Sequence, residues 1–131
     1  MTARARRLIT IGTAALVRLG TPAFADEVAG PAHDYLLSCG GCHGLDGAGS
    51  ARVPSLRGVD ALLARPAGRA YVLRVPGVAS APLSDARLAA LLDWVFLHFD
   101  NRTPTNFTAA EVGAARAEPW VDPKAARLAL D

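Results

Sequence analysis

Cys39-Gly40-Gly41-Cys42-His43 is the stretch that decides how the rest of this sequence is interpreted. It contains both cysteines of the chain and one of its three histidines. Two thiols three positions apart, followed at once by an imidazole, are the attachment signature of c-type haem. Each thiol can add to one vinyl group on the same edge of a porphyrin, and the adjacent histidine can bind the iron. The stretch therefore predicts one covalently attached haem c.

Other uses of this cysteine pair have less support. A disulfide between Cys39 and Cys42 would close a very small ring, which adds little stability. A thioredoxin-like redox site needs its cysteines after a buried strand and at the start of a helix, whereas the residues before Cys39 look helical. A zinc site would need a fourth ligand. His33, His98 and the carboxylates could supply it only without zinc-finger spacing, so the dithiol and zinc sites remain minor alternatives.

The first 25 residues have the three-part pattern of a secretory signal. Residues 1–7 contain three arginines and no acid, residues 8–17 are apolar, and Ala23-Phe24-Ala25 provides the small residues of a cleavage site. The apolar stretch is far shorter than the roughly 20 residues that span a bilayer. We therefore expect cleavage after Ala25, export to the periplasm and no membrane span in the mature chain.

Removing the signal reverses the sign of the net charge. The whole chain has 14 basic and 12 acidic residues, a net charge of +2. The signal contains four of the arginines and no acid, so 10 basic and 12 acidic residues remain, a net charge of −2. No cluster of lysine and arginine with aromatic residues is left. We therefore expect no nucleic-acid partner.

Helical patterns predominate after the signal, and no segment alternates like a strand. We expect helices over 32–39, 60–64, 68–74 and 84–99, and a glycine-rich loop over 44–58. Ser84 is the expected N-cap of the longest helix, in which leucines recur at steps of three and four. The sequence thus predicts an all-α fold with a small apolar core, to which a buried haem would add apolar surface.

The residues after the haem motif carry a second set of signals. Gly44, Gly47 and Gly49 form a glycine-rich loop, and Pro54-Ser-Leu56-Arg-Gly58 follows it. Leu83-Ser84-Asp85 then leads into an alanine- and leucine-rich helix that contains Trp94. Over roughly residues 32–99 this combination resembles the class I cytochromes c. The resemblance implies a small cytochrome c-like helical domain wrapped around one haem.

The resemblance also assigns roles to matching positions. Cys39 and Cys42 would carry the two thioether bonds, and His43 would be the proximal iron ligand. The Pro54 carbonyl would accept a hydrogen bond from the His43 ring nitrogen that does not bind iron, which fixes the tautomer.

Several further side chains could contact the haem. Tyr35 and Trp94 would lie where the first and last helices of the domain cross, although core packing alone explains both. Arg57, Arg69 and Tyr71 could reach the haem propionates, although solvation is the simpler role for an arginine.

The sequence departs from the family at the second axial ligand. The family usually places Met-Pro before the last helix, but the only methionine of this chain is Met1, and Val75-Pro76 occupies the corresponding position. His98 and His33 are candidate distal ligands. Otherwise the iron is five-coordinate or water-bound, or takes an unusual donor: Tyr71, Lys124 or the new amino terminus at Asp26. Axial ligation matters because it shifts haem potentials over about 0.8 V.

Residues 100–131 are expected to form a short helical extension. Thr108 and Glu111 form a capping box for a helix to about Ala117, and Asp122-Pro123 begins a last helix to Leu130. The predicted organisation is a signal at 1–25, a cytochrome c domain at 26–99 and the extension at 100–131.

The resemblance implies an electron carrier and not an enzyme. It would relay electrons in the periplasm between redox protein partners, a dehydrogenase on one side and a respiratory acceptor such as a terminal oxidase on the other. An open distal face leaves a second interpretation, a haem enzyme or a sensor of small gaseous ligands. No acid–base pair that would assist peroxide chemistry is recognisable near that face.

Overall fold

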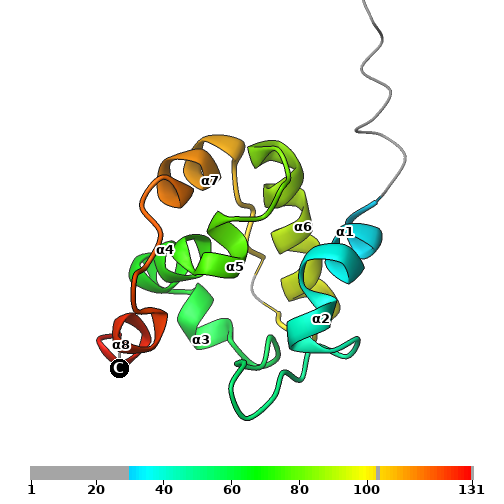
Figure 1. Cartoon of the computed structure of the whole chain (residues 1–131), viewed down its shortest axis with the longest axis horizontal. Coiled ribbons are helices and arrows are strands. Elements are labelled where there is room, and N and C mark those ends of the chain that lie inside the picture. Colours follow the sequence, from blue (N-terminus) through cyan, green and yellow to red (C-terminus); the bar gives the residue numbers. More distant parts are fainter. Residues whose placement is uncertain (1–29, 103, 131) are drawn as a thin grey trace, which may run out of the picture.

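The computed structural model describes residues 30–102 and 104–130, and within these ranges the chain is helical with no strand. The predicted all-α class is therefore confirmed (Figure 1). The helices are α1 (Pro31–Ser38), α2 (Gly40–His43), α3 (Asp60–Leu63), α4 (Pro66–Arg74), α5 (Pro76–Ala79), α6 (Asp85–His98), α7 (Ala109–Arg116) and α8 (Pro123–Leu128). The predicted signal and its cleavage site at Ala25 lie outside the described residues.

Three of the predicted helix starts are formed with the predicted caps. The side chains of Ser84, Thr108 and Asp122 each accept a hydrogen bond from the backbone N–H three residues later, at 3.3, 3.1 and 2.9 Å. These bonds satisfy N–H groups that have no partner inside the helix. Local sequence is therefore sufficient to define where α6, α7 and α8 begin.

Two prolines correct the expected boundaries. Pro66 begins α4, two residues before the predicted start, and Pro76 begins α5, where the sequence predicts a break. Proline is well suited to the first helical position because its missing N–H would have no intrahelical partner there. The sequence also offers Asp60 as the cap of the helix expected over 60–64, but Val59 is the N-cap of α3. The Asp60 carboxylate instead accepts a hydrogen bond from the Arg102 backbone N–H at 2.7 Å.

The core is formed where α1, α4, α6 and α7 meet. α1 packs along α6, and α7 packs against both α6 and α4 (Figure 1). Tyr35 of α1 is 2% exposed, and its ring centroid lies 5.1 Å from that of Phe99 and 6.0 Å from that of Trp94. The aromatic contact predicted for the first and last helices of the cytochrome-like segment is thus present as core packing.

Residues beyond 99 share this core. Phe107 and Val112 belong to the same buried cluster as the apolar residues of α4 and α6. Arg69 of α4 donates to the Thr105 carbonyl at 2.5 Å and to the Glu111 carboxylate at 3.0 and 3.1 Å. The division between 26–99 and 100–131 stays a prediction, but the second part packs on the first.

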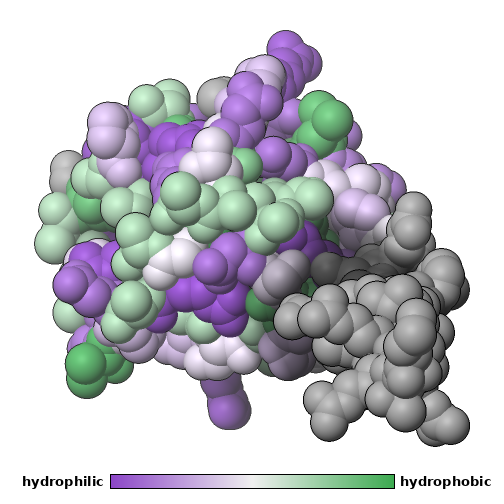
Figure 2. All heavy atoms as spheres, turned by 90° about the horizontal axis from the view of Figure 1, so that it is seen from above, coloured by the Kyte–Doolittle hydropathy of each residue, from purple (hydrophilic) through white to green (hydrophobic). Residues whose placement is uncertain are grey.

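The surface is mixed in character. On the face shown in Figure 2, hydrophilic and hydrophobic side chains are interspersed. Large apolar side chains that are exposed include Leu36, Leu37, Leu45, Leu97, Val121 and Leu128. Among the residues that the structure describes, no helix is both long and apolar enough to cross a membrane.

Candidate functional site

The predicted haem-attachment residues lie together at the end of α1. Cys39 is the residue between α1 and the single turn of α2, and its carbonyl accepts from the backbone N–H groups of Cys42 and His43 at 3.1 and 3.0 Å. Both cysteines are free thiols. Cys42 is exposed and Cys39 is partly buried. Burial raises the pKa of the Cys39 thiol, and the nearby Cys42 adds to the shift.

His43 has one ring nitrogen engaged by the backbone. Its Nδ1 lies 3.0 Å from the carbonyl oxygen of Pro54. Because a carbonyl oxygen can only accept, Nδ1 carries the proton and donates it, and Nε2 keeps a lone pair. A neutral imidazole with a free Nε2 is the form that binds a metal. The contact is the one that the cytochrome resemblance implied for this pair.

The glycine-rich loop carries Pro54 to this position. The Ser50 backbone N–H donates to the Val53 carbonyl at 2.8 Å, which closes a tight turn. Gly49 has φ 73°, and a Cβ there would lie 2.3 Å from the Val53 oxygen and 2.6 Å from the Pro54 oxygen. Only glycine fits this backbone conformation and this close approach. The loop therefore depends on Gly49 to bring the Pro54 carbonyl within hydrogen-bond distance of His43 Nδ1.

Asn101, which no sequence pattern singles out, ties the same loop to the end of α6. It is 3% exposed, and its Oδ1 accepts from the Val59 backbone N–H at 2.8 Å. Its Nδ2 lies 2.8 Å from the Leu56 oxygen, 3.0 Å from the Phe96 oxygen and 3.3 Å from the Phe99 oxygen. No helical or strand pattern marks such a residue, because its partners are distant backbone groups.

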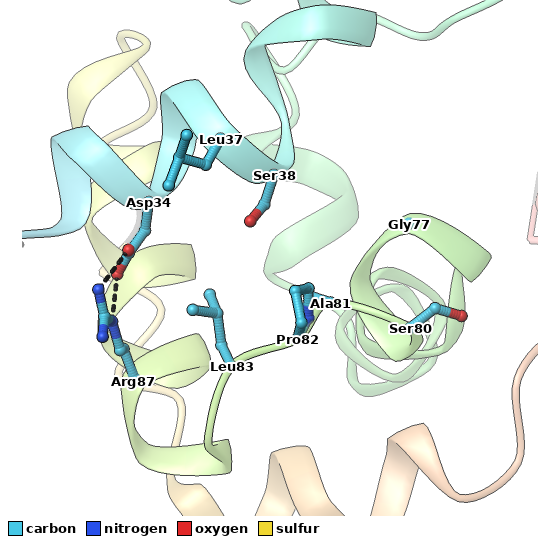
Figure 3. A pocket seen from close by; sticks show the side chains of 9 residues that line it. All are labelled: Asp34, Leu37, Ser38, Gly77, Ser80, Ala81, Pro82, Leu83 and Arg87. Atoms are coloured by element: carbon cyan, nitrogen blue, oxygen red, sulfur yellow. Dashed lines mark hydrogen bonds and ion pairs between the residues drawn. The ribbon is translucent and has the colours of Figure 1, made fainter. Parts of the chain in front are cut away.

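A buried ion pair, which no sequence pattern marks, closes one side of a cavity beside the attachment turn. Asp34 is 2% exposed and accepts two hydrogen bonds of 2.7 Å from the Arg87 guanidinium. The hydrogen bonds from Arg87 lower the pKa of Asp34, although burial opposes the shift. Figure 3 shows this pair at the edge of the space between α1 and the segment that precedes α6.

The cavity has a volume of about 390 Å³, which lies within the range of about 300–1,000 Å³ for small-molecule and cofactor sites. Its lining residues come from α1, from α5 with the segment after it, and from α6: Asp34, Leu37, Ser38, Gly77, Ser80, Ala81, Pro82, Leu83 and Arg87. In Figure 3 the side chains of Ser38 and Leu83 extend into the space between α1 and residues 81–83. Leu37 and Ser38 come directly before Cys39, so the cavity adjoins the attachment turn.

The distal candidates lie in different parts of the chain. His98 is the exposed last residue of α6, and its ring stacks on Trp94 with centroids 4.3 Å apart and planes at 14°. His33 is exposed on α1 and Lys124 is exposed on α8. Asp26 lies outside the described residues. Ligation by any of them stays a prediction, and the structure adds that the His98 ring is held against an indole.

The side chains considered for the haem propionates have other partners. Arg57 donates to the Asp46 backbone oxygen at 2.7 Å and pairs with the Asp46 carboxylate at 3.4 Å. Tyr71 is 9% exposed, burial raises its pKa, and the Arg127 guanidinium lies 5.9 Å from its ring. Arg69 is bound by α7 and the residues before it, as described above. Arg69 is thus part of the protein's own packing, whereas Arg57, whose side chain is 45% exposed, forms a surface ion pair and remains solvated.

The donor set and its surroundings match the requirements of a covalent haem. Two free thiols are present in one turn, a histidine tautomer leaves Nε2 available, and a cavity adjoins the turn. Val75, which the resemblance aligns with the methionine of class I cytochromes c, is partly buried against the core between α4 and α5. In the described ranges, no group of three or more histidine, cysteine, aspartate or glutamate residues could hold a metal ion.

Comparison with known proteins gives no further guide. No protein-family model matches the chain, and no curated protein is significantly similar to it. The functional argument therefore rests on the residues of the site.

Proposed function

We propose that this protein is a monohaem c-type cytochrome that transfers electrons and has no substrate chemistry of its own. Cys39 and Cys42 would hold the haem covalently, and His43 would be its proximal ligand. The observation that carries the proposal is the 3.0 Å contact between His43 Nδ1 and the Pro54 oxygen next to two free thiols. This contact leaves Nε2 for iron and increases the basicity of the ligand.

The bound haem would supply a one-electron redox centre. The protein's part would be to hold the group, to orient the imidazole and to exclude water. The apolar side chains that face the cavity, Leu37, Ala81 and Leu83 among them, suit a flat hydrophobic ligand. α1, α5 and α6 would thus wrap around the haem in a cytochrome c-like arrangement.

The proposed location is the periplasm, with the signal removed after Ala25. Thioether formation requires reduced, accessible cysteines, and Cys42 is exposed. The proposed partners are redox proteins, a periplasmic dehydrogenase as donor and a respiratory acceptor such as a terminal oxidase. Electrons would pass by outer-sphere transfer, which requires close approach of the partners but no bound substrate.

One observation supports a second candidate, a haem enzyme or a gas sensor with an open distal site. The only methionine is Met1, and Val75 stands where the family usually has its distal methionine. A valine side chain has no donor atom, so residue 75 cannot supply the sixth ligand of the iron. An iron with an open position binds carbon monoxide or nitric oxide and transfers electrons with larger reorganisation.

Two measurements test these proposals. A haem stain of the purified protein on a denaturing gel should be positive, and it should be lost in a Cys39→Ala/Cys42→Ala variant. Absence of covalent haem in the unaltered protein would defeat both candidates. Absorption spectra with and without carbon monoxide then separate them. Spectra that do not respond to carbon monoxide support the carrier, whereas rapid uptake by a high-spin iron supports the sensor or enzyme.

A further inference from the structure

Tyr35 contacts the one-turn helix that carries the proposed iron ligand. Its hydroxyl donates a hydrogen bond of 2.5 Å to the carbonyl oxygen of Gly44, the residue directly after His43. At the other end of the turn, a Cβ on Gly40 would stand 3.7 Å from Tyr35 Cε1, so the backbone of Gly40 passes close to the ring. One side chain therefore touches both the beginning and the end of α2.

Such support is needed because α2 cannot hold its own shape. A four-residue helix is too short to be stable alone, and its terminal carbonyls lack partners within the helix. Here the carbonyl of Gly40 accepts from the Gly44 N–H at 3.0 Å, and that of His43 accepts from the Gly49 N–H at 2.9 Å. Tyr35 donates to the next carbonyl, that of Gly44, where the chain turns away with φ 77°. This carbonyl also accepts a longer hydrogen bond, of 3.5 Å, from the Gly47 N–H.

Tyr35 itself is fixed. It is 2% exposed, and it packs against Phe99 and Trp94 of the α6 region. A phenylalanine would fill the same space, and a buried hydroxyl without a partner costs free energy. Burial also raises the pKa of Tyr35, which keeps the hydroxyl protonated and able to donate. The hydroxyl therefore has a use at Gly44 that core packing does not explain.

We propose that Tyr35 is a positioning residue for His43, with its hydroxyl fixing the backbone after the ligand while Pro54 fixes the ring. The inference rests on the proposed haem attachment. The backbone on one side and Nδ1 on the other are then both held, so the direction in which Nε2 points is determined. Loss of the hydroxyl leaves the Gly44 carbonyl with only its 3.5 Å hydrogen bond from the Gly47 N–H. The backbone after His43 is then held less firmly, which lets the imidazole turn about its contact with Pro54.

The test uses the holoprotein with Tyr35→Phe, and Thr105→Val as the control that removes another buried hydroxyl. Thr105 is 6% exposed, and its hydroxyl donates to the Asp93 carboxylate rather than to the attachment turn. Two properties are measured: the pattern of hyperfine-shifted haem-methyl signals in the ferric NMR spectrum, and the acidic pH at which the histidine leaves the iron. For Tyr35→Phe we expect a changed methyl pattern. We also expect the equilibrium constant for loss of the histidine from iron to rise roughly threefold to tenfold, the effect of one neutral hydrogen bond, so detachment occurs at a higher pH. We expect no change for Thr105→Val.

The outcomes separate this inference from the proposed function. Absence of covalent haem in the unaltered protein overturns both. Covalent haem with the same methyl pattern and the same detachment pH in Tyr35→Phe overturns the inference alone. If Tyr35→Phe yields no folded holoprotein, Tyr35 is replaced by 3,5-difluorotyrosine, whose more acidic hydroxyl is a stronger donor. Harder detachment with an altered methyl pattern then supports the positioning role, and no change refutes it.

Discussion

The carboxylate of Asp34 accepts two 2.7 Å hydrogen bonds from the guanidinium of Arg87, across the contact between α1 and α6. The Asp34 side chain is 3% exposed and that of Arg87 is 21% exposed. A paired charge at this depth is tolerated because each partner satisfies the other, whereas an unpaired one is costly. The two residues are 53 positions apart in sequence, so the pair joins helices from distant parts of the chain.

Arg87→Ala should be strongly destabilising. It leaves the buried Asp34 carboxylate without its partner, and breaking such a pair costs about 3–5 kcal/mol. Glu118→Gln is the control, because its carboxylate is 79% exposed and 3.6 Å from Arg74, and loss of an exposed pair costs about 0–1 kcal/mol. Urea unfolding at pH 7 gives both values. Equal free-energy losses in the two variants would contradict the importance assigned to the Asp34 pair.

The same pair predicts a loss of stability in acid. Hydrogen bonds from Arg87 hold the pKa of Asp34 below its usual value of 3.8. The folded protein therefore binds this proton more weakly than the unfolded chain does, so the contribution is complete above about pH 3.8 and disappears as the pH falls further. Unfolding free energies measured between pH 6 and pH 2 should fall less steeply in an Asp34→Asn variant. Parallel curves would show that another group is responsible.

Gly47 and Gly58 form a matched pair for testing how the loop meets α6. Both have positive φ, 69° and 65°, so alanine costs about 1–2 kcal/mol of backbone strain at either position. A Cβ at Gly47 would also lie 2.7 Å from Phe99 Cγ, whereas at Gly58 nothing lies within 4 Å. Gly47→Ala should therefore destabilise by about 1–3 kcal/mol more than Gly58→Ala, the usual cost of overpacking. When Phe99→Leu is the parent protein, the extra cost of Gly47→Ala should mostly disappear. Thermal unfolding of Gly47→Ala, Gly58→Ala, Phe99→Leu and the Gly47→Ala/Phe99→Leu double variant provides the comparison.

His98→Phe should leave the iron environment unchanged. The His98 ring is exposed and stacks on Trp94, and phenylalanine preserves the stack while removing both nitrogen donors. We expect ferric and ferrous absorption spectra identical to those of the unaltered protein. Conversion of a six-coordinate to a five-coordinate spectrum would instead identify His98 as the distal ligand, and His33→Phe serves as the second exposed histidine for comparison.

The two thiols should react at different rates in the haem-free protein. Cys42 is exposed, whereas Cys39 is partly buried and its pKa is raised by that burial. The thiolate is the reactive form, so Cys39 should be alkylated more slowly. Iodoacetamide labelling at pH 7.5 with peptide mass mapping measures each site. In urea, where the chain is unfolded, the two thiols should be alkylated at equal rates. Equal rates in the native protein would argue against the buried position of Cys39.

Sequence patterns predicted what depends on neighbours along the chain. Ser84, Thr108 and Asp122 act as caps because their partners are only three residues away, and the leucine spacing of α6 follows from the helical repeat. The prolines at 66 and 76 were the ambiguous case, since proline both stops one helix and begins the next. A helix before the attachment residues and a glycine-rich loop after them were predicted, but the helical turn Gly40–His43 between them was not, because two glycines disfavour a helix locally.

What sequence could not supply depends on distant partners. Asp34 looks like an ordinary surface acid until the fold brings Arg87 beside it. Asn101 follows a helix as many exposed asparagines do, yet it binds the backbone of two other segments. No local pattern encodes these pairings. The same limit applies to the distal side of the candidate site, where the sequence offers several donors and their relation to the iron depends on the holoprotein.

The shared core of α4, α6 and α7 has a consequence for the timing of biogenesis. Phe107 and Val112 complete a cluster that also contains Tyr35. In a polypeptide exported with its amino terminus first, that cluster stays incomplete until residue 112 has emerged from the translocation channel. Cys39 emerges more than seventy residues earlier. Under the proposed export and haem attachment, the late arrival of α7 would delay closure of the fold and keep Cys39 and Cys42 accessible for thioether formation.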